Sequence, residues 1–258
     1  MQKSWYRVMI VCSLLILVSL SIITNAQIRT AEQPPDIDKI IKEFASKESD
    51  FKENRNSYTF RQEVRIQTIG PSNRPTGEFF RISDIVFDDS SKRTERIVRF
   101  PQSTLRDLVI TPTDLKDLEE IQTFCLTTKD LPKYSINYVG KEKIDEIDTY
   151  VFDVKPKSIP KYKRGGERVL LGRIWVDDQD LQIVKVSGKG LPEGEERFPK
   201  FETYRENIDG KYWFPTYTFS DDVLEFPGNS IHTRMEVRYT NYKRFSSDVK
   251  IELGTDED

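Results

Sequence analysis

The apolar residues near the start of the chain recur at the spacing of one helical face. Over residues 36–51 the apolar positions lie three or four residues apart, Asp36 can cap the first turn, and Pro35 stands just before it. The spacing therefore predicts one amphipathic helix that begins near Asp36. Its apolar positions are Ile37, Ile40, Ile41 and Phe44.

A second and shorter helical pattern interrupts the middle of the chain. Residues 103–128 break the alternation on either side of them, and Thr113 and Asp114 precede apolar residues at helical spacing. Acidic side chains near its start favour a helix there, because they interact well with the positive end of the helix dipole. The apolar residues are Leu115, Leu118 and Ile121.

Most of the remaining chain alternates between apolar and polar residues with a period of two. In the first such segment Tyr58, Phe60, Val64 and Ile66 share one parity, and charged or amide side chains take the other. Alternation of this kind is typical of a β-strand with one dry and one wet face, and the whole pattern predicts about nine or ten strands. The strands are predicted over residues 58–67, 78–87, 93–100, 136–144, 149–155, 172–176, 181–187, 201–206, 212–219 and 231–245.

Short turns join consecutive strands, which indicates an antiparallel meander. The turn with Asp209 and Gly210 is a strong hairpin signal. A sheet needs cover on one face, so we predict an α+β, mainly β fold in which helices cover the concave face of one large curved antiparallel sheet. We expect residues 36–253 to form a single domain, because no repeat or linker divides them.

The first 26 residues have the order of a secretory signal peptide. Lys3 and Arg7 give a positive start, a mostly apolar run covers residues 8–23, and Thr24-Asn25-Ala26 provides small residues for cleavage after Ala26. An uncleaved anchor helix is the alternative, but the apolar run is short of the roughly 20 residues that span a bilayer. We therefore expect an exported protein.

The segments next to the predicted domain have other compositions. No cysteine follows the apolar run as a lipid anchor requires, since Cys12 lies inside that run, so we expect a soluble mature protein. Residues 27–35 are expected to be a flexible leader. Residues 254–258 are expected to be an acidic, disordered tail.

Composition excludes several classes of protein. Cys125 is the one cysteine after the signal peptide, so the mature chain has no internal disulfide and depends on its own core. The net charge is −3. Loss of Lys3 and Arg7 with the signal peptide makes the mature chain more acidic still, which gives no electrostatic support for nucleic-acid binding.

The residues that carry most catalysis are scarce. His232 is the one histidine, it shares a polar strand face with charged residues, and no nucleophile motif accompanies it. The acidic turns at residues 145–148 and 177–180 lack the ligand pattern of a calcium loop, and one histidine cannot build a zinc site. We expect no catalytic residues, metal or cofactor. An exported hydrolase is the least favoured alternative.

The second half of the chain carries a series of motifs with a family resemblance. Over residues 134–245 this series resembles the outer-membrane lipoprotein-sorting proteins of the LolA/LolB/RseB-like superfamily. The motifs are Tyr138-Val139-Gly140-Lys141-Glu142, Gly172-Arg173-Ile174-Trp175-Val176-Asp177, Asp209-Gly210-Lys211-Tyr212-Trp213-Phe214-Pro215 and Tyr239-Thr240-Asn241-Tyr242. The resemblance implies an incomplete barrel with the two helices as its lid.

This resemblance also implies a function. It predicts a non-catalytic, periplasmic lipid or lipoprotein carrier that takes part in outer-membrane lipoprotein sorting. Its partners would be acyl chains and a membrane-protein donor or acceptor, and we expect a monomer. The alternative is a periplasmic sensor or regulatory module of the RseB-like type that docks on a membrane protein.

Two groups of residues are candidates for ligand contact. The apolar group would line a cavity for acyl chains, although ordinary core packing is the simpler interpretation. It comprises Phe60, Val64, Ile66, Phe80, Trp175, Phe214, Tyr217 and Phe219. The basic group would contact anionic headgroups or an acidic partner, unless it is simply a solvated loop. It comprises Lys161, Lys163 and Arg164.

Overall fold

The period-two segments form a single antiparallel sheet. The computed structural model describes residues 35–87, 90, 92–120 and 123–245, and within them ten strands are present. They are β1 (Tyr58–Ile69), β2 (Pro75–Phe87), β3 (Arg93–Arg99), β4 (Tyr134–Ile144), β5 (Ile147–Pro156), β6 (Val169–Asp177), β7 (Ile183–Leu191), β8 (Phe201–Asn207), β9 (Trp213–Phe226) and β10 (Asn229–Arg244). Each overlaps a predicted strand.

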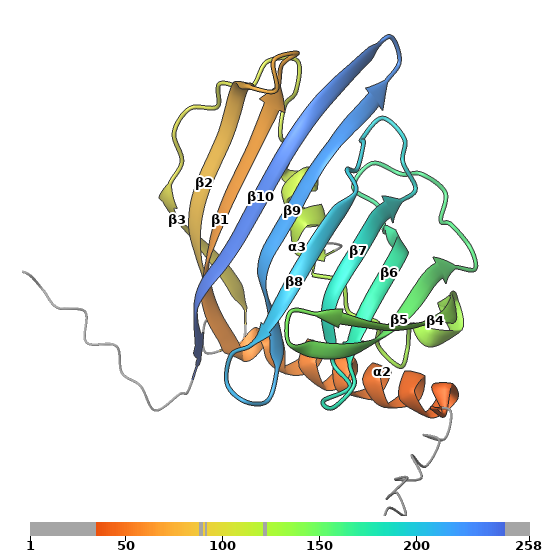
Figure 1. Ribbon diagram of the computed structural model, residues 1–258. Helices are drawn as coiled ribbons and strands as arrows, with labels where there is room; N and C mark the ends of the chain where they lie inside the picture. Colours follow the sequence, from red (N-terminus) through yellow and green to blue (C-terminus); the bar gives the residue numbers. More distant parts are fainter. Residues whose placement is uncertain (1–34, 88–89, 91, 121–122, 246–258) are drawn as a thin grey trace, which may run out of the picture. The chain divides into compact units, whose positions relative to one another are not determined.

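The strand order is β3-β2-β1-β10-β9-β8-β7-β6-β5-β4. β1 pairs with β10, which joins the first three strands to the later meander. The curved sheet stays open between β3 and β4 (Figure 1). This arrangement confirms the predicted fold class and matches an incomplete barrel.

Both predicted helices are present. They are α2 (Ile37–Asn54) and α3 (Pro112–Glu120). No helix among the described residues is long and apolar enough to cross a membrane. Residues Met1–Asp36 form a separate unit from residues Ile37–Asp258, and everything described below lies in the second unit. The predicted signal peptide, the leader before Pro35 and the acidic tail lie outside the described residues.

One face of the sheet carries both helices. A row of paired residues crosses seven strands on this face, from β1 to β5. The row is Val64, Val237, Thr218, Thr203, Val186, Ile174 and Phe152. Leu118 of α3 packs at the Val64 end, and Phe44 of α2 packs at the Phe152 end. We call this side the helix-covered face.

α2 is held on the sheet by its apolar face and by one buried ion pair. Phe44 is fully buried and its ring lies 5.5 Å from that of Phe152. One turn later, Glu48 accepts hydrogen bonds of 2.9 and 3.1 Å from Nη1 of Arg205 in β8. Arg205 also donates to the carbonyl oxygen of Phe124, and its guanidinium lies over the Phe51 ring.

The Glu48–Arg205 pair is completely enclosed, with side-chain exposures of 1% and 0%. Burial by itself lowers the pKa of Arg205, but the Glu48 carboxylate outweighs this effect and raises the pKa. The guanidinium therefore stays charged, and the pair fixes the position of α2 along the sheet. A buried pair of this kind specifies an arrangement more than it adds stability, because both charges lose their hydration.

Removing one partner of this pair should be far more costly than removing a surface pair. We expect Glu48→Ala to lower the free energy of unfolding by about 3–5 kcal/mol, because Arg205 is left buried and unpaired. Urea unfolding followed by circular dichroism measures the change.

The matched control is Glu43→Ala in the same helix. Glu43 forms an exposed pair with Lys39, and its loss should change the free energy of unfolding by less than about 1 kcal/mol. Equal effects of the two substitutions would show that the buried pair does not anchor α2.

Candidate functional site

A cavity of about 250 Å³ lies on the helix-covered face, beside α3. We call it the α3 cavity. Strands β1, β9 and β10 form its floor, and the segments at residues 108–111 and 195–199 form its walls. The apolar lining residues that are buried are Ile66, Leu118, Phe198, Leu224 and Met235.

The alternation of side chains along each strand explains why these residues share the floor of the cavity. Ile66 pairs with Met235 across the β1–β10 contact, so both side chains lie on the same face as the row through Val64. Leu224 of β9 pairs with Ile231 of β10 on that face. Leu118 of α3 belongs to the same apolar cluster as Val64, Ile66 and Met235, and it lines the cavity at the α3 end.

The rim of the α3 cavity is charged. It includes four acids and two arginines. They are Asp114, Asp117, Glu195, Glu196, Arg164 and Arg197. An apolar floor below a charged rim suits a ligand with a hydrocarbon body and a polar end.

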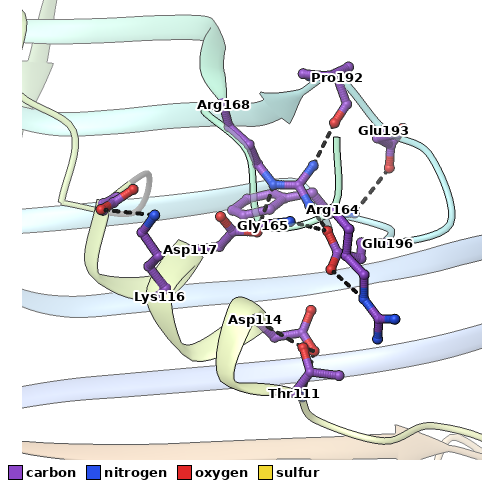
Figure 2. Close-up of polar contacts among 12 residues, drawn as sticks. Thr111, Asp114, Lys116, Asp117, Arg164, Gly165, Arg168, Pro192, Glu193 and Glu196 are labelled. Carbon is purple, nitrogen blue, oxygen red and sulfur yellow. Dashed lines mark hydrogen bonds and ion pairs between the residues drawn. The ribbon is translucent and has the colours of Figure 1, made fainter. Parts of the chain in front are cut away.

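α3 begins at a reciprocal cap next to the cavity. Thr111 Oγ1 accepts a hydrogen bond of 3.2 Å from the backbone N–H of Asp114, and the Asp114 carboxylate accepts one of 2.7 Å from the backbone N–H of Thr111 (Figure 2). Pro112 occupies the first helical position, where no N–H is needed. The helix therefore starts slightly before the position that the sequence pattern predicts.

A buried arginine ties α3 to the loop between β7 and β8. Arg168 Nε lies 2.6 Å from Asp117 Oδ2, and Arg168 also donates to the carbonyl oxygen of Pro192 (Figure 2). Its third contact is Glu196, at 3.3 Å, and its guanidinium lies over the Phe198 ring. The side chain of Arg168 is only 5% exposed, so inside the protein this residue joins α3 to the wall of the α3 cavity that carries Glu196.

The charge on Asp117 depends on this arginine. Burial raises the pKa of Asp117, Arg168 opposes that change, and the nearby carboxylates of Asp114 and Glu196 raise the pKa further. Without Arg168, the Asp117 carboxylate would have no cation to offset its lost hydration.

The predicted basic group lies beside the rim. Lys161, Lys163 and Arg164 are exposed. Arg164 lines the α3 cavity and lies 3.7 Å from Glu196. The loop that carries them packs against the loop between β7 and β8. The Tyr162 ring lies so close to Gly194 that a Cβ atom on residue 194 would come within 2.4 Å of the ring.

Half of the predicted apolar group lies on the helix-covered face. Val64 and Ile66 lie in the α3 cluster, and Ile66 lines the α3 cavity. Phe60 and Phe214 pack against Tyr242, and their ring centroids lie 5.2 and 4.7 Å from the centroid of the Tyr242 ring. Of the eight predicted residues, Ile66 is thus the one in this cavity.

The other half lies on the opposite face, and three of its four rings contact cations. Phe80 lies under Arg65 and Arg99, Trp175 under Lys185, and Tyr217 under Arg238. Phe219 stacks on Tyr217. The physical reason is strand parity: the neighbours Phe79, Ile174, Val176 and Thr218 point to the helix-covered face. These four side chains therefore do not line the α3 cavity.

Several cavity residues carry little signal in the sequence. Met235 belongs to the apolar parity of its strand, so its face was predictable. Phe198 lies in a loop that has no period. Leu224 follows the polar stretch at residues 220–222, and this stretch led to a predicted strand that ends before Leu224. In the structure β9 continues through the polar stretch, because Asp221 and Asp222 pair with Arg234 and Thr233 of β10.

The residues considered for chemistry lie elsewhere. His232 is on the face opposite to α3, next to Asp221, which also pairs with Arg234. Within the described residues, no group of three or more His, Cys, Asp or Glu side chains could hold a metal ion. Cys125 is a buried free thiol.

No protein-family model and no curated protein matches the chain. Among solved structures, it is similar to a DUF1329 family protein from Desulfovibrio piger, with 15% identity, coverage of 81% of this chain and 95% of that chain, and a TM-score of 0.39. It is similar to a LolA superfamily protein from Nitrosomonas europaea, with 16% identity, coverage of 81% and 93%, and a TM-score of 0.36. It is also similar to the MucA/MucB complex of Pseudomonas aeruginosa, with 8% identity, coverage of 78% and 100%, and a TM-score of 0.21.

The LolA superfamily is the group that the sequence pattern resembles. Each of these identities is below 20% and each TM-score is below 0.5. The fold and the α3 cavity describe the class of protein: an open antiparallel sheet with an apolar cavity on its helix-covered face. Its function is therefore argued from the geometry of this chain.

Removing Arg168 should loosen α3. We expect Arg168→Gln to lower the free energy of unfolding by about 3 kcal/mol, because Asp117 and Glu196 lose their buried cation. Amide hydrogen exchange across residues 112–120 should become faster.

Arg164→Gln is the control for this experiment, because its side chain is 73% exposed and pairs with the same Glu196. It should change the free energy of unfolding by less than about 1 kcal/mol. Unchanged hydrogen exchange in Arg168→Gln would contradict the role of Arg168 in holding α3.

Proposed function

We propose that this protein is a non-catalytic periplasmic carrier that holds an acyl chain of a lipid or lipoprotein in the α3 cavity. The observation that carries the proposal is the cavity itself, with buried apolar residues at its floor and charged residues at its rim. Each CH₂ group removed from water is worth about 0.8 kcal/mol. Such a cavity binds hydrocarbon without any reactive group.

The predicted export supports this role. A hydrocarbon chain that leaves a membrane is exposed to water, and a protein cavity removes that cost during transfer. The sequence predicts a signal peptide and no later membrane segment. A carrier of this kind receives its ligand from one membrane-bound partner and delivers it to another, so a membrane-protein donor and acceptor are part of the proposal.

The basic loop at residues 161–164 is the proposed contact for anionic headgroups. Lys161 and Lys163 are exposed, and Arg164 of the same loop lines the α3 cavity. Exposed Ile159 lies in the same loop and adds apolar surface. Basic and apolar side chains together suit a surface of anionic lipid.

A periplasmic sensor that docks on a membrane protein is the second candidate. The observation that favours it is the edge strand β3, in which all seven residues are exposed. Its apolar residues Ile97 and Val98 are 54% and 49% exposed. An exposed edge can accept a strand from a partner. Affinity purification that recovers one stable protein partner and no lipid would favour this second candidate.

A bulky side chain in the cavity should block lipid uptake. Mature protein incubated with a bacterial lipid extract and then repurified should carry bound lipid that mass spectrometry detects. Leu224→Trp should reduce that lipid at least roughly tenfold, because the indole fills space that the chain would occupy.

The control is Val223→Trp, one residue earlier in β9. Val223 is 46% exposed and lies on the opposite face, so its substitution should leave lipid uptake unchanged. Absence of acyl lipid from the unmodified protein would contradict the carrier function.

Reversing the charge of the basic loop should weaken membrane contact. In vesicle co-sedimentation, Lys161→Glu, Lys163→Glu and Arg164→Glu together should lower binding to anionic vesicles at least about tenfold, since each basic residue near such a surface is worth about 1 kcal/mol. The same number of reversals at Lys39, Lys42 and Lys47 of α2 is the control. Equal losses in both variants would show that only total charge matters.

A further inference from the structure

The volume of the α3 cavity limits the size of its ligand. The cavity holds about 250 Å³. An apolar cavity of about 150 Å³ admits benzene, which corresponds to about 25 Å³ for each carbon atom and leaves room here for about ten carbons. A lipid with two or three long chains has several times as many carbons. One chain segment fits, and a whole multi-chain lipid does not.

α3 bounds the cavity on one side. Leu118 lines the cavity and belongs to one apolar cluster with Val64, Ile66 and Met235. α3 itself is held by the buried contact between Asp117 and Arg168. A longer chain would leave its remaining carbons outside the rim, in water, where they gain nothing from the cavity.

The rim disfavours a free carboxylate. Asp114, Asp117, Glu195 and Glu196 outnumber the two lining arginines, and they still outnumber the cations when Arg168 behind the wall is included. A fatty-acid carboxylate would add one more negative charge beside these acids. An esterified or amidated carboxyl group adds no charge and avoids this repulsion.

A neutral carbonyl group also has a donor available. The Nε atom of Arg197 is buried and has no hydrogen-bond partner among the described residues. Its guanidinium lies over the Phe226 ring, at 5.8 Å from the ring centroid, and both residues line the α3 cavity. A buried donor without a partner is costly, and the carbonyl oxygen of an ester or amide at the rim can accept its hydrogen bond.

From these observations we infer that the α3 cavity selects a single acyl segment of about ten carbons whose carboxyl group is esterified or amidated, with Arg197 donating to its carbonyl oxygen. The inference rests on the proposed function and specifies its ligand. It separates this ligand from free fatty acids by charge, and from multi-chain lipids by volume.

A chain-length series tests the size limit. Monoacylglycerols with chains of about six to sixteen carbons are titrated into the full mature chain by calorimetry, below their aggregation concentrations. Affinity should rise by up to roughly fourfold for each added CH₂ and level off near ten carbons. An affinity that keeps rising to the longest chain would overturn the size limit.

Matched fatty acids test the choice of headgroup. At neutral pH the free acid of ten carbons should bind at least about tenfold more weakly than the monoacylglycerol, because of rim repulsion. Glu195→Gln should strengthen binding of the acid several-fold more than binding of the ester, whereas the exposed Glu53→Gln on α2 should change neither. Arg197→Met should weaken the ester several-fold. Equal or tighter binding of the acid, or no response to Glu195→Gln, would overturn selection by charge.

The failure of this inference can be told apart from the failure of the proposed function. If no acyl compound of any length or headgroup binds, the carrier function itself is wrong. If acyl compounds bind without a plateau or without preference for the ester, the carrier function stands and the ligand assignment is wrong.

Discussion

An open antiparallel sheet must cover one apolar face, and this requirement sets the rest of the structure. α2 covers one part of that face through Phe44 and its neighbours, and α3 covers another part through Leu118. β9 and β10 extend past α3 (Figure 1). There the apolar residues Leu224 and Met235 line a cavity, so the proposed binding site is a consequence of how little helix covers so long a sheet.

Two buried arginines fix the position of this cover. Arg205 holds α2 through Glu48, and Arg168 holds α3 through Asp117. Each pair loses much of its hydration on folding, so its main effect is to specify one arrangement of helix on sheet. The shape of the α3 cavity depends most on the second pair, because Arg168 joins α3 to the loop that carries Phe198 and the acidic rim.

The elements of the fold could be predicted from the sequence, and the site only partly. The period of two located each strand, and parity placed Val64, Ile66 and Met235 on one face. Parity was ambiguous where apolar residues stand on both faces, as at Phe79 and Phe80. The sequence predicts that large aromatic side chains such as Trp175 line a cavity, yet these lie on the face opposite to the helices, where lysine and arginine side chains cover their rings.

The remaining features depend on contacts between distant parts of the chain. Glu48 and Arg205 are 157 positions apart, and no local pattern marks either residue as buried. Phe198 and Arg197 lie in a loop, where apolar residues have no period. Such residues become meaningful only when the strand order brings their segments together.

The central claim is that hydrocarbon lies in the α3 cavity, on the floor formed by β1, β9 and β10. Nuclear Overhauser effects between a bound ten-carbon monoacylglycerol and the methyl groups of the protein test it most directly. The account predicts contacts from the end of the chain to the methyl groups of Ile66, Leu118 and Met235. Contacts confined to residues of the opposite face, such as Val223, would contradict it.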